Sequence, residues 1–161
     1  INALARTTKK TAVIVAALAL LAAATALLIY GPSPSSQSSY IDPADKSLVA
    51  SGKPIYLTHC ASCHGANLEG QADWRIRKSN GRLPAPPHDE SGHTWHHADS
   101  VLMEITRNGL VPGVTAPEGY VSDMPAYSKL LNDHQIRAVL AYIKSSWSKQ
   151  ARDRQKQITQ Q

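Results

Sequence analysis

The sequence predicts an all-α domain preceded by one transmembrane helix. Three features of the 161-residue chain support this prediction: an uncharged apolar run near its start, a helical apolar face near its end, and the motif Cys-x-x-Cys-His between them. No strand-rich pattern surrounds the motif. Phe is absent and aromatic residues make up only 6% of the chain, so a core of side chains alone would be thin and a bound group is expected to fill it.

The uncharged run, residues 11–30, predicts a membrane anchor because a helix of about 20 residues crosses the ~30 Å hydrocarbon layer. Arg6, Lys9 and Lys10 precede it, and positive charges on that side place residues 1–10 in the cytoplasm. We therefore expect a single-pass protein of the bacterial inner membrane, in contact with the lipid bilayer, whose following domain lies on the periplasmic side. A cleaved signal peptide is the alternative.

The rest of the chain divides into a linker, a domain and a tail. Residues 31–46 are rich in Pro and Ser and are predicted to link the anchor to the domain, residues 47–147. Residues 148–161 have almost no apolar side chains, which predicts a polar tail that extends into solvent or stays unfolded. The net charge of +5 comes from the two ends, since residues 31–148 hold ten Lys or Arg and eleven Asp or Glu. Without a basic cluster on the domain, we expect no nucleic-acid binding.

The two cysteines, Cys60 and Cys63, are followed directly by His64. A disulfide, half of a zinc site and a thioredoxin-like redox pair are the alternatives for Cys-x-x-Cys. A structural zinc site needs four protein ligands, and the chain has no second pair of cysteines. With the added histidine, the motif is the attachment signal for haem c. Its thiols bind the two vinyl groups of one porphyrin, and His64 is then placed to bind the iron.

Residues 46–147 resemble the class I c-type cytochromes, a family whose all-α fold wraps around one covalent haem c. Gly52 and Tyr56 stand eight and four positions before Cys60, where the family places a small residue and an aromatic. Residues 132–147 match the family's C-terminal helix, with an apolar face of Ile136, Val139, Leu140 and Ile143. The resemblance implies that Gly52 and Tyr56 contact this helix at Val139 and Tyr142.

Helix boundaries can also be predicted. Residues 99–108 have helical spacing, with Asp99 or Ser100 as the expected N-cap and Gly109 just past the end. Asn132 or Asp133 is expected to cap the last helix of the domain. Pro54 departs from the family pattern and predicts that the first helix starts late or is kinked.

The resemblance implies the remaining haem contacts. Met124, in the segment Met-Pro-Ala-Tyr, is implied as the second axial ligand, while Met103 has helical spacing and is interpreted as a core residue. A thioether ligand raises the reduction potential, and an iron with both axial positions filled indicates electron transfer rather than catalysis. The resemblance also implies that the carbonyl of a proline after the motif accepts from the Nδ1–H of His64. Pro84, Pro86 and Pro87 are the candidates, and the Ala-Pro-Pro pattern favours Pro86. Two positions later, His88 stands where the family often has Leu.

Four histidines lie close together in residues 88–99: His88, His93, His96 and His97. We interpret this segment as a polar loop that covers the haem edge, with Trp74 and Trp95 as walls of the pocket. The alternatives are a second metal site, such as a copper site, and a histidine that replaces methionine on the haem iron.

Together these features predict a protein that transfers single electrons and is not an enzyme. Its expected partner is a membrane complex: an oxidase, a quinol-oxidising complex or a photosynthetic centre. A permanent subunit of such a complex is favoured over a tethered shuttle between two complexes, because the linker is short. A haem enzyme or sensor with a labile distal ligand is the remaining alternative.

Overall fold

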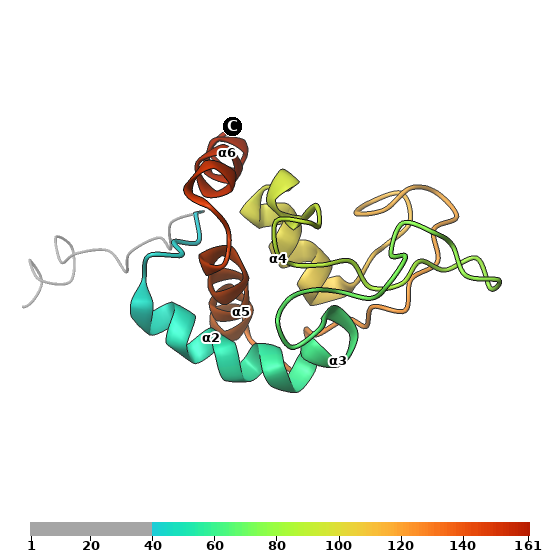
Figure 1. Cartoon of the computed structure of the whole chain (residues 1–161), viewed down its shortest axis with the longest axis horizontal. Helices are drawn as coiled ribbons and strands as arrows, with labels where there is room; N and C mark the ends of the chain where they lie inside the picture. Colours follow the sequence, from blue (N-terminus) through green and yellow to red (C-terminus); the bar gives the residue numbers. More distant parts are fainter. Residues whose placement is uncertain (1–39) are drawn as a thin grey trace, which may run out of the picture. The chain divides into compact units, whose positions relative to one another are not determined.

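The computed structural model describes residues 40–161, so the predicted anchor at residues 11–30 lies outside the described part. The described elements are α2 (Lys46–His59), α3 (Ala61–His64), η1 (Thr94–His96), α4 (Asp99–Asn108), α5 (Asp133–Ser145) and α6 (Lys149–Thr159), as Figure 1 shows. Within this part no residue belongs to a β-strand, and one isolated bridge joins Pro112 to Ala116. The all-α prediction is therefore confirmed for residues 40–161. Among these residues, no helix has the length and apolar composition of a membrane span.

Helices α2 and α5 form the main helix pair of the domain (Figure 1). Gly52 is buried where they meet, and a Cβ atom there would lie only 1.9 Å from the carbonyl oxygen of Ala138 and 3.0 Å from the nitrogen of Val139. One turn further, the rings of Tyr56 and Tyr142 lie 5.4 Å apart. The implied contact of Gly52 and Tyr56 with the C-terminal helix of the domain is therefore confirmed.

The ends of α2 and α5 are capped by side chains. Asp45 accepts hydrogen bonds from the N–H groups of Ser47 and Leu48, so α2 begins at Lys46 and does not start late. Pro54 lies inside the helix, and the alternative of a kink there stays a prediction. Asn132 caps α5 in a capping box with Gln135, as predicted for this position.

Helix α4 has the predicted bounds but a different N-cap. Ala98 occupies the cap position without a side-chain hydrogen bond, so the expectation of Asp99 or Ser100 is wrong. The carboxylate of Asp99 is fully buried instead and lies 2.8 Å from the Nζ atom of Lys144 on α5. A long-range ion pair has replaced the local cap. Gly109 ends the helix with φ of 78°, a conformation that favours glycine.

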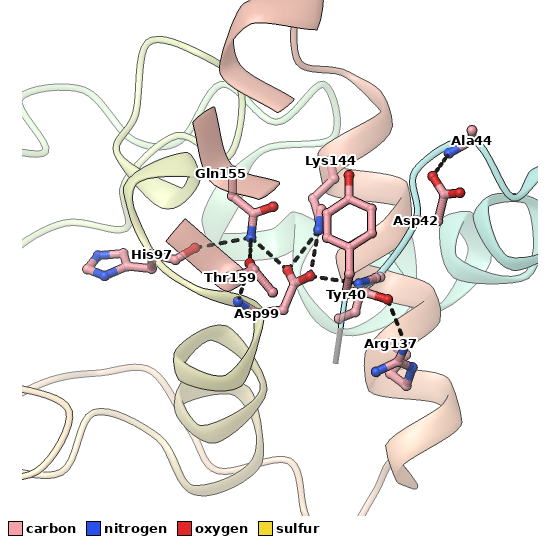
Figure 2. A network of polar contacts seen from close by, with 10 residues as sticks. Tyr40, Asp42, Ala44, His97, Asp99, Arg137, Lys144, Gln155 and Thr159 are labelled. Atoms are coloured by element: carbon pink, nitrogen blue, oxygen red, sulfur yellow. Dashed lines mark hydrogen bonds and ion pairs between the residues drawn. The ribbon is translucent and has the colours of Figure 1, made fainter. Parts of the chain in front are cut away.

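The C-terminal residues form helix α6, which packs against the domain, so the prediction of a solvated or unfolded tail is wrong. Ser148 caps the helix, and Ala151 and Gln155 are buried. The Nε2 atom of Gln155 donates to the carboxylate of Asp99 at 2.7 Å and to the carbonyl of His97 at 3.1 Å (Figure 2). These contacts hold α6 against the start of α4.

The same carboxylate holds the first described residues. Ile41 is fully buried and its N–H donates to Asp99 at 2.7 Å, while Arg137 donates to the carbonyl of Tyr40 at 3.2 Å (Figure 2). The Nζ atom of Lys144 lies 4.1 Å from the centre of the Tyr40 ring. Tyr40 and Ile41, assigned to the linker by sequence, thus pack against the domain.

Candidate haem site

The motif Cys-x-x-Cys-His occupies the corner between α2 and α3. The N–H of Cys60 donates to the carbonyl of Tyr56 at 2.8 Å, and the N–H of His64 donates to the carbonyl of Cys60 at 2.9 Å. Neither thiol is in a disulfide; Cys60 is buried and Cys63 is exposed. Burial, with a smaller effect of Cys63, raises the pKa of the Cys60 thiol to about 11. Because residues three apart on a helical turn are neighbours, the two thiols can reach one porphyrin.

His64 is buried and held by one hydrogen bond. Its Nδ1 atom lies 2.8 Å from the carbonyl oxygen of Pro86, so this nitrogen donates and the lone pair of Nε2 is available to a metal. Burial lowers the pKa of the imidazole, and the Pro86 contact opposes this effect. The ring is therefore neutral at pH 7, which is the form that ligates metals. The structure brings these two residues together as the resemblance implies, and their roles at an iron atom stay predictions.

The loop after His64 brings the Pro86 segment close. The hydroxyl of Tyr56 donates to the carbonyl of Gly65 at 2.8 Å, and the N–H of Gly70 donates to the carbonyl of His64 at 2.7 Å. Gly70 has φ of 70°, and a Cβ atom there would lie 2.4 Å from the nitrogen of Pro87. Only glycine allows this approach, so Gly70 indirectly positions the carbonyl that accepts from His64.

Met124 is half-buried and packs against the core, as does Met103. Its segment is held by Tyr127, whose hydroxyl donates to the carbonyl of His59 at 2.6 Å and whose N–H donates to the carbonyl of Thr106 at 3.1 Å. Sequence reasoning assigned no role to Tyr127, although it is the last residue of the Met-Pro-Ala-Tyr segment. Tyr127 ties this segment to the haem-attachment corner. The binding of Met124 to iron stays a prediction.

The histidines of residues 88–99 form ring contacts, including one between His93 and His97 at 5.4 Å, but no metal site among the described residues. Trp74 stacks on His93 with ring centres 5.7 Å apart, and Trp95 stacks on His96 at 3.7 Å. Trp95 also packs against the core, and its Nε1 donates to the carbonyl of Glu90 at 3.3 Å. Among the described residues, no three His, Cys, Asp or Glu side chains are placed to hold a metal ion. The copper alternative therefore finds no support, and the two tryptophans as walls of the pocket stay a prediction.

His88 lies apart from this group, beside His64. The two imidazoles stack with centres 3.9 Å apart and planes inclined by 24°. The N–H of His88 donates to the carbonyl of Leu68 at 2.8 Å, and its carbonyl accepts from the Nε1 of Trp147 at 2.8 Å. Its buried Nδ1 has no hydrogen-bond partner among residues 40–161. Burial, with smaller effects of His64 and His93, lowers the pKa of His88 well below its usual value.

These residues fit a covalent haem. The corner offers two thiols that form no disulfide, a neutral imidazole with Nε2 available, and a thioether segment tied to the same corner by Tyr127. Thiols and imidazole are the donor set by which haem c is attached. The fold and the site thus define a c-type haem domain.

Comparison with known proteins gives the family. The family model for cytochrome c matches residues 49–147, more than half of the chain, and the chain belongs to this family as a class I c-type cytochrome. Members of the family bind haem c covalently.

Three relatives illustrate where such domains occur. The CcoP subunit of a cbb3-type cytochrome c oxidase from Azospirillum sp. (strain B510) is 31% identical over 100 residues, which are 62% of this chain and 29% of that protein. The cytochrome c subunit of a quinone alcohol dehydrogenase from Gluconacetobacter polyoxogenes is 29% identical over 128 residues, 74% of this chain and 25% of the relative. The cytochrome c subunit of the cytochrome bc1 complex from Corynebacterium diphtheriae is 30% identical over 103 residues, 64% and 34% of the two chains.

The chain thus spans between a quarter and about a third of the length of these relatives. No solved structure matches it.

Proposed function

We propose that this chain is a membrane-anchored monohaem cytochrome c that passes single electrons as a subunit of a respiratory or photosynthetic membrane complex. The observation that carries the proposal is the hydrogen bond from His64 to Pro86 at the Cys-x-x-Cys corner. Haem c, when bound there, supplies an iron that alternates between the ferric and ferrous states.

The side chains at the corner between α2 and α3 have different roles in binding the haem. Cys60 and Cys63 would hold the porphyrin through thioether bonds, and His64 and Met124 would supply the nitrogen and sulfur ligands of its iron. The Pro86 carbonyl fixes the orientation of the His64 ring and raises its basicity. If His64 and Met124 both bound the iron, no coordination position would be open to a substrate, which favours electron transfer over catalysis.

Two observations favour a permanent subunit. The relatives described above are named as subunits of an oxidase, a quinone dehydrogenase and a bc1 complex. In addition, Ile41 is buried in the domain, so only residues 31–39 separate the predicted anchor from packed structure. Even fully extended, nine residues reach only about 30 Å. A tether of this length suits one docking site at the periplasmic surface better than movement between two complexes.

The test is the behaviour of the native protein in membranes solubilised with a mild detergent. A subunit will co-migrate with a large complex in native electrophoresis, and the haem stain will follow it. Migration as a small free protein would favour the tethered shuttle. Recovery of the haem protein from the soluble fraction would contradict the anchor. Rapid binding of carbon monoxide to the reduced protein would instead indicate a labile distal ligand, as in a haem enzyme or sensor.

A further inference from the structure

We propose that His88 is a positioning residue that stacks on the proximal ligand His64 and lowers the reduction potential of the haem. The role goes beyond the ligand set described above, and it rests on the proposed function only in requiring a haem bound through His64. The resemblance to class I cytochromes implies that Leu often stands at this position, where this chain has His88.

The geometry fixes the ring of His88 against His64. The ring centres are 3.9 Å apart and the planes are inclined by only 24°, which is a face-to-face contact. The centre of the Tyr56 ring lies 6.0 Å from that of His88, with the planes inclined by 59°. Hydrogen bonds to Leu68 and from Trp147 hold the backbone of His88 at both its N–H and its carbonyl. The stack is therefore built into the fold rather than made by a mobile side chain.

The lack of a hydrogen bond at one nitrogen of His88 also supports a role for the ring stack. A buried imidazole retained for structure is normally paired at its nitrogens. The Nδ1 of His88 is buried yet has no partner among the described residues, so no hydrogen bond at this nitrogen holds the ring in place. What the side chain does offer is its face, and that face contacts His64.

Two physical effects of this contact both lower the reduction potential of the haem. Ferric haem carries one more positive charge than ferrous haem, and part of this charge is shared by the ligating imidazole. The electron-rich face of an uncharged aromatic ring attracts positive charge, so the stack stabilises the ferric state. A polar ring also makes the surroundings of the ligand less apolar than an aliphatic side chain would, which again favours the more charged state. Replacement of His88 by Leu should therefore raise the potential.

The experiment compares the haem-loaded wild type with His88→Leu and His88→Phe, and with His134→Leu as a matched control. His134 is exposed in the first turn of α5 and makes none of these contacts. Redox titration should show that His88→Leu shifts the ferrous-to-ferric ratio at a fixed applied potential toward ferrous. We expect about tenfold, by analogy with the lower end of the ~10–100-fold effects that residues around a metal ligand have on metal affinity or activity. His88→Phe keeps the stack but loses the polar ring, so a smaller shift of the same sign is expected. His134→Leu should leave the ratio unchanged.

Electron paramagnetic resonance of the ferric proteins supplies a second readout, because the orientation of the His64 ring determines the g-values. We expect altered g-values for His88→Leu and values close to wild type for His88→Phe. An unchanged or lowered potential for His88→Leu with haem bound overturns the proposal. If the Leu variant does not mature, His88→Phe decides alone: a raised potential supports the role and an unchanged one refutes it. Wild-type protein without covalent haem would refute the proposed function itself, which is a different result.

Discussion

The buried ion pair of Lys144 and Asp99 offers the sharpest test of how the domain is held together. Both side chains are fully buried, and the pair joins α4 to α5 (Figure 2). The same carboxylate accepts from Ile41 and Gln155, so it also holds the first described segment and α6. The variant Lys144→Met removes the cation while keeping a side chain of similar length.

The magnitude follows from the geometry. At 2.8 Å and an effective dielectric constant of about 20, the Coulomb attraction of the pair is about 6 kcal/mol, against which the desolvation of both groups must be set. In Lys144→Met the Asp99 carboxylate stays buried without its cation, and such changes cost about 3–5 kcal/mol. Replacement of both partners, in Asp99→Asn with Lys144→Met, leaves no buried charge and should recover at least half of this loss.

Urea unfolding of the haem-loaded protein, followed by circular dichroism, measures the difference in the free energy of unfolding. Lys149→Met is the matched control, because Lys149 pairs with Asp153 at 2.6 Å on the exposed face of α6. An exposed pair of this kind contributes about 0.3–0.5 kcal/mol. A loss below about 1 kcal/mol for Lys144→Met, or a double variant no more stable than the single one, would refute this account of the pair.

Three further predictions concern the site and the pH dependence. Met124→Ala should keep the haem attached but lower its reduction potential, and an unchanged potential in redox titration would show that Met124 is not on the iron. Gly70→Ala forces a Cβ atom to within 2.4 Å of the Pro87 nitrogen, so its thermal midpoint should fall further than that of Gly81→Ala, which has the same left-handed backbone strain at φ of 79° but open space around it. Burial lowers the pKa of His97 below 6.5, so the unfolded chain binds more protons as the pH falls through this value and the free energy of unfolding should decrease. Urea unfolding between pH 7.5 and 5.5 gives the slope of the free energy of unfolding against pH. This slope should be smaller in His97→Gln than in wild type, by at most about 1.4 kcal/mol per pH unit, and an identical slope would contradict the lowered pKa of His97.

Much of the domain could be predicted because its determinants are local or lie in a short motif. The apolar spacing and the capping residue Asn132 locate α5 to within a few residues. The helical spacing that ends at Gly109 locates α4. Gly52 stands eight positions before Cys60 in the sequence, where the family has a small residue that contacts the C-terminal helix. The family resemblance therefore predicts its contact with α5. In each case the residues that determine the structure are close in sequence or stand at fixed positions from the motif.

Two errors, at the start of α4 and in the C-terminal residues, share a physical cause: a polar residue has a long-range partner instead of its most common local role. Asp99 was expected to cap α4, but Lys144, 45 positions further along, pairs with it in the interior. Helix α6 reads as a polar tail because the contact that holds it to Asp99 comes from Gln155, a residue typical of surfaces. The link from Tyr127 to His59 and the stack of His88 on His64 likewise join residues far apart or separated by an irregular loop. Such pairings depend on the folded chain and leave no periodic pattern in the sequence.

The central claim, that Cys60 and Cys63 hold one haem c covalently, is tested most directly by the intact mass of the denatured protein purified from its native membrane. Our account predicts a mass larger than that of the polypeptide by one haem and no free thiol detectable after denaturation. A mass equal to that of the polypeptide alone, with both thiols open to alkylation, would contradict it.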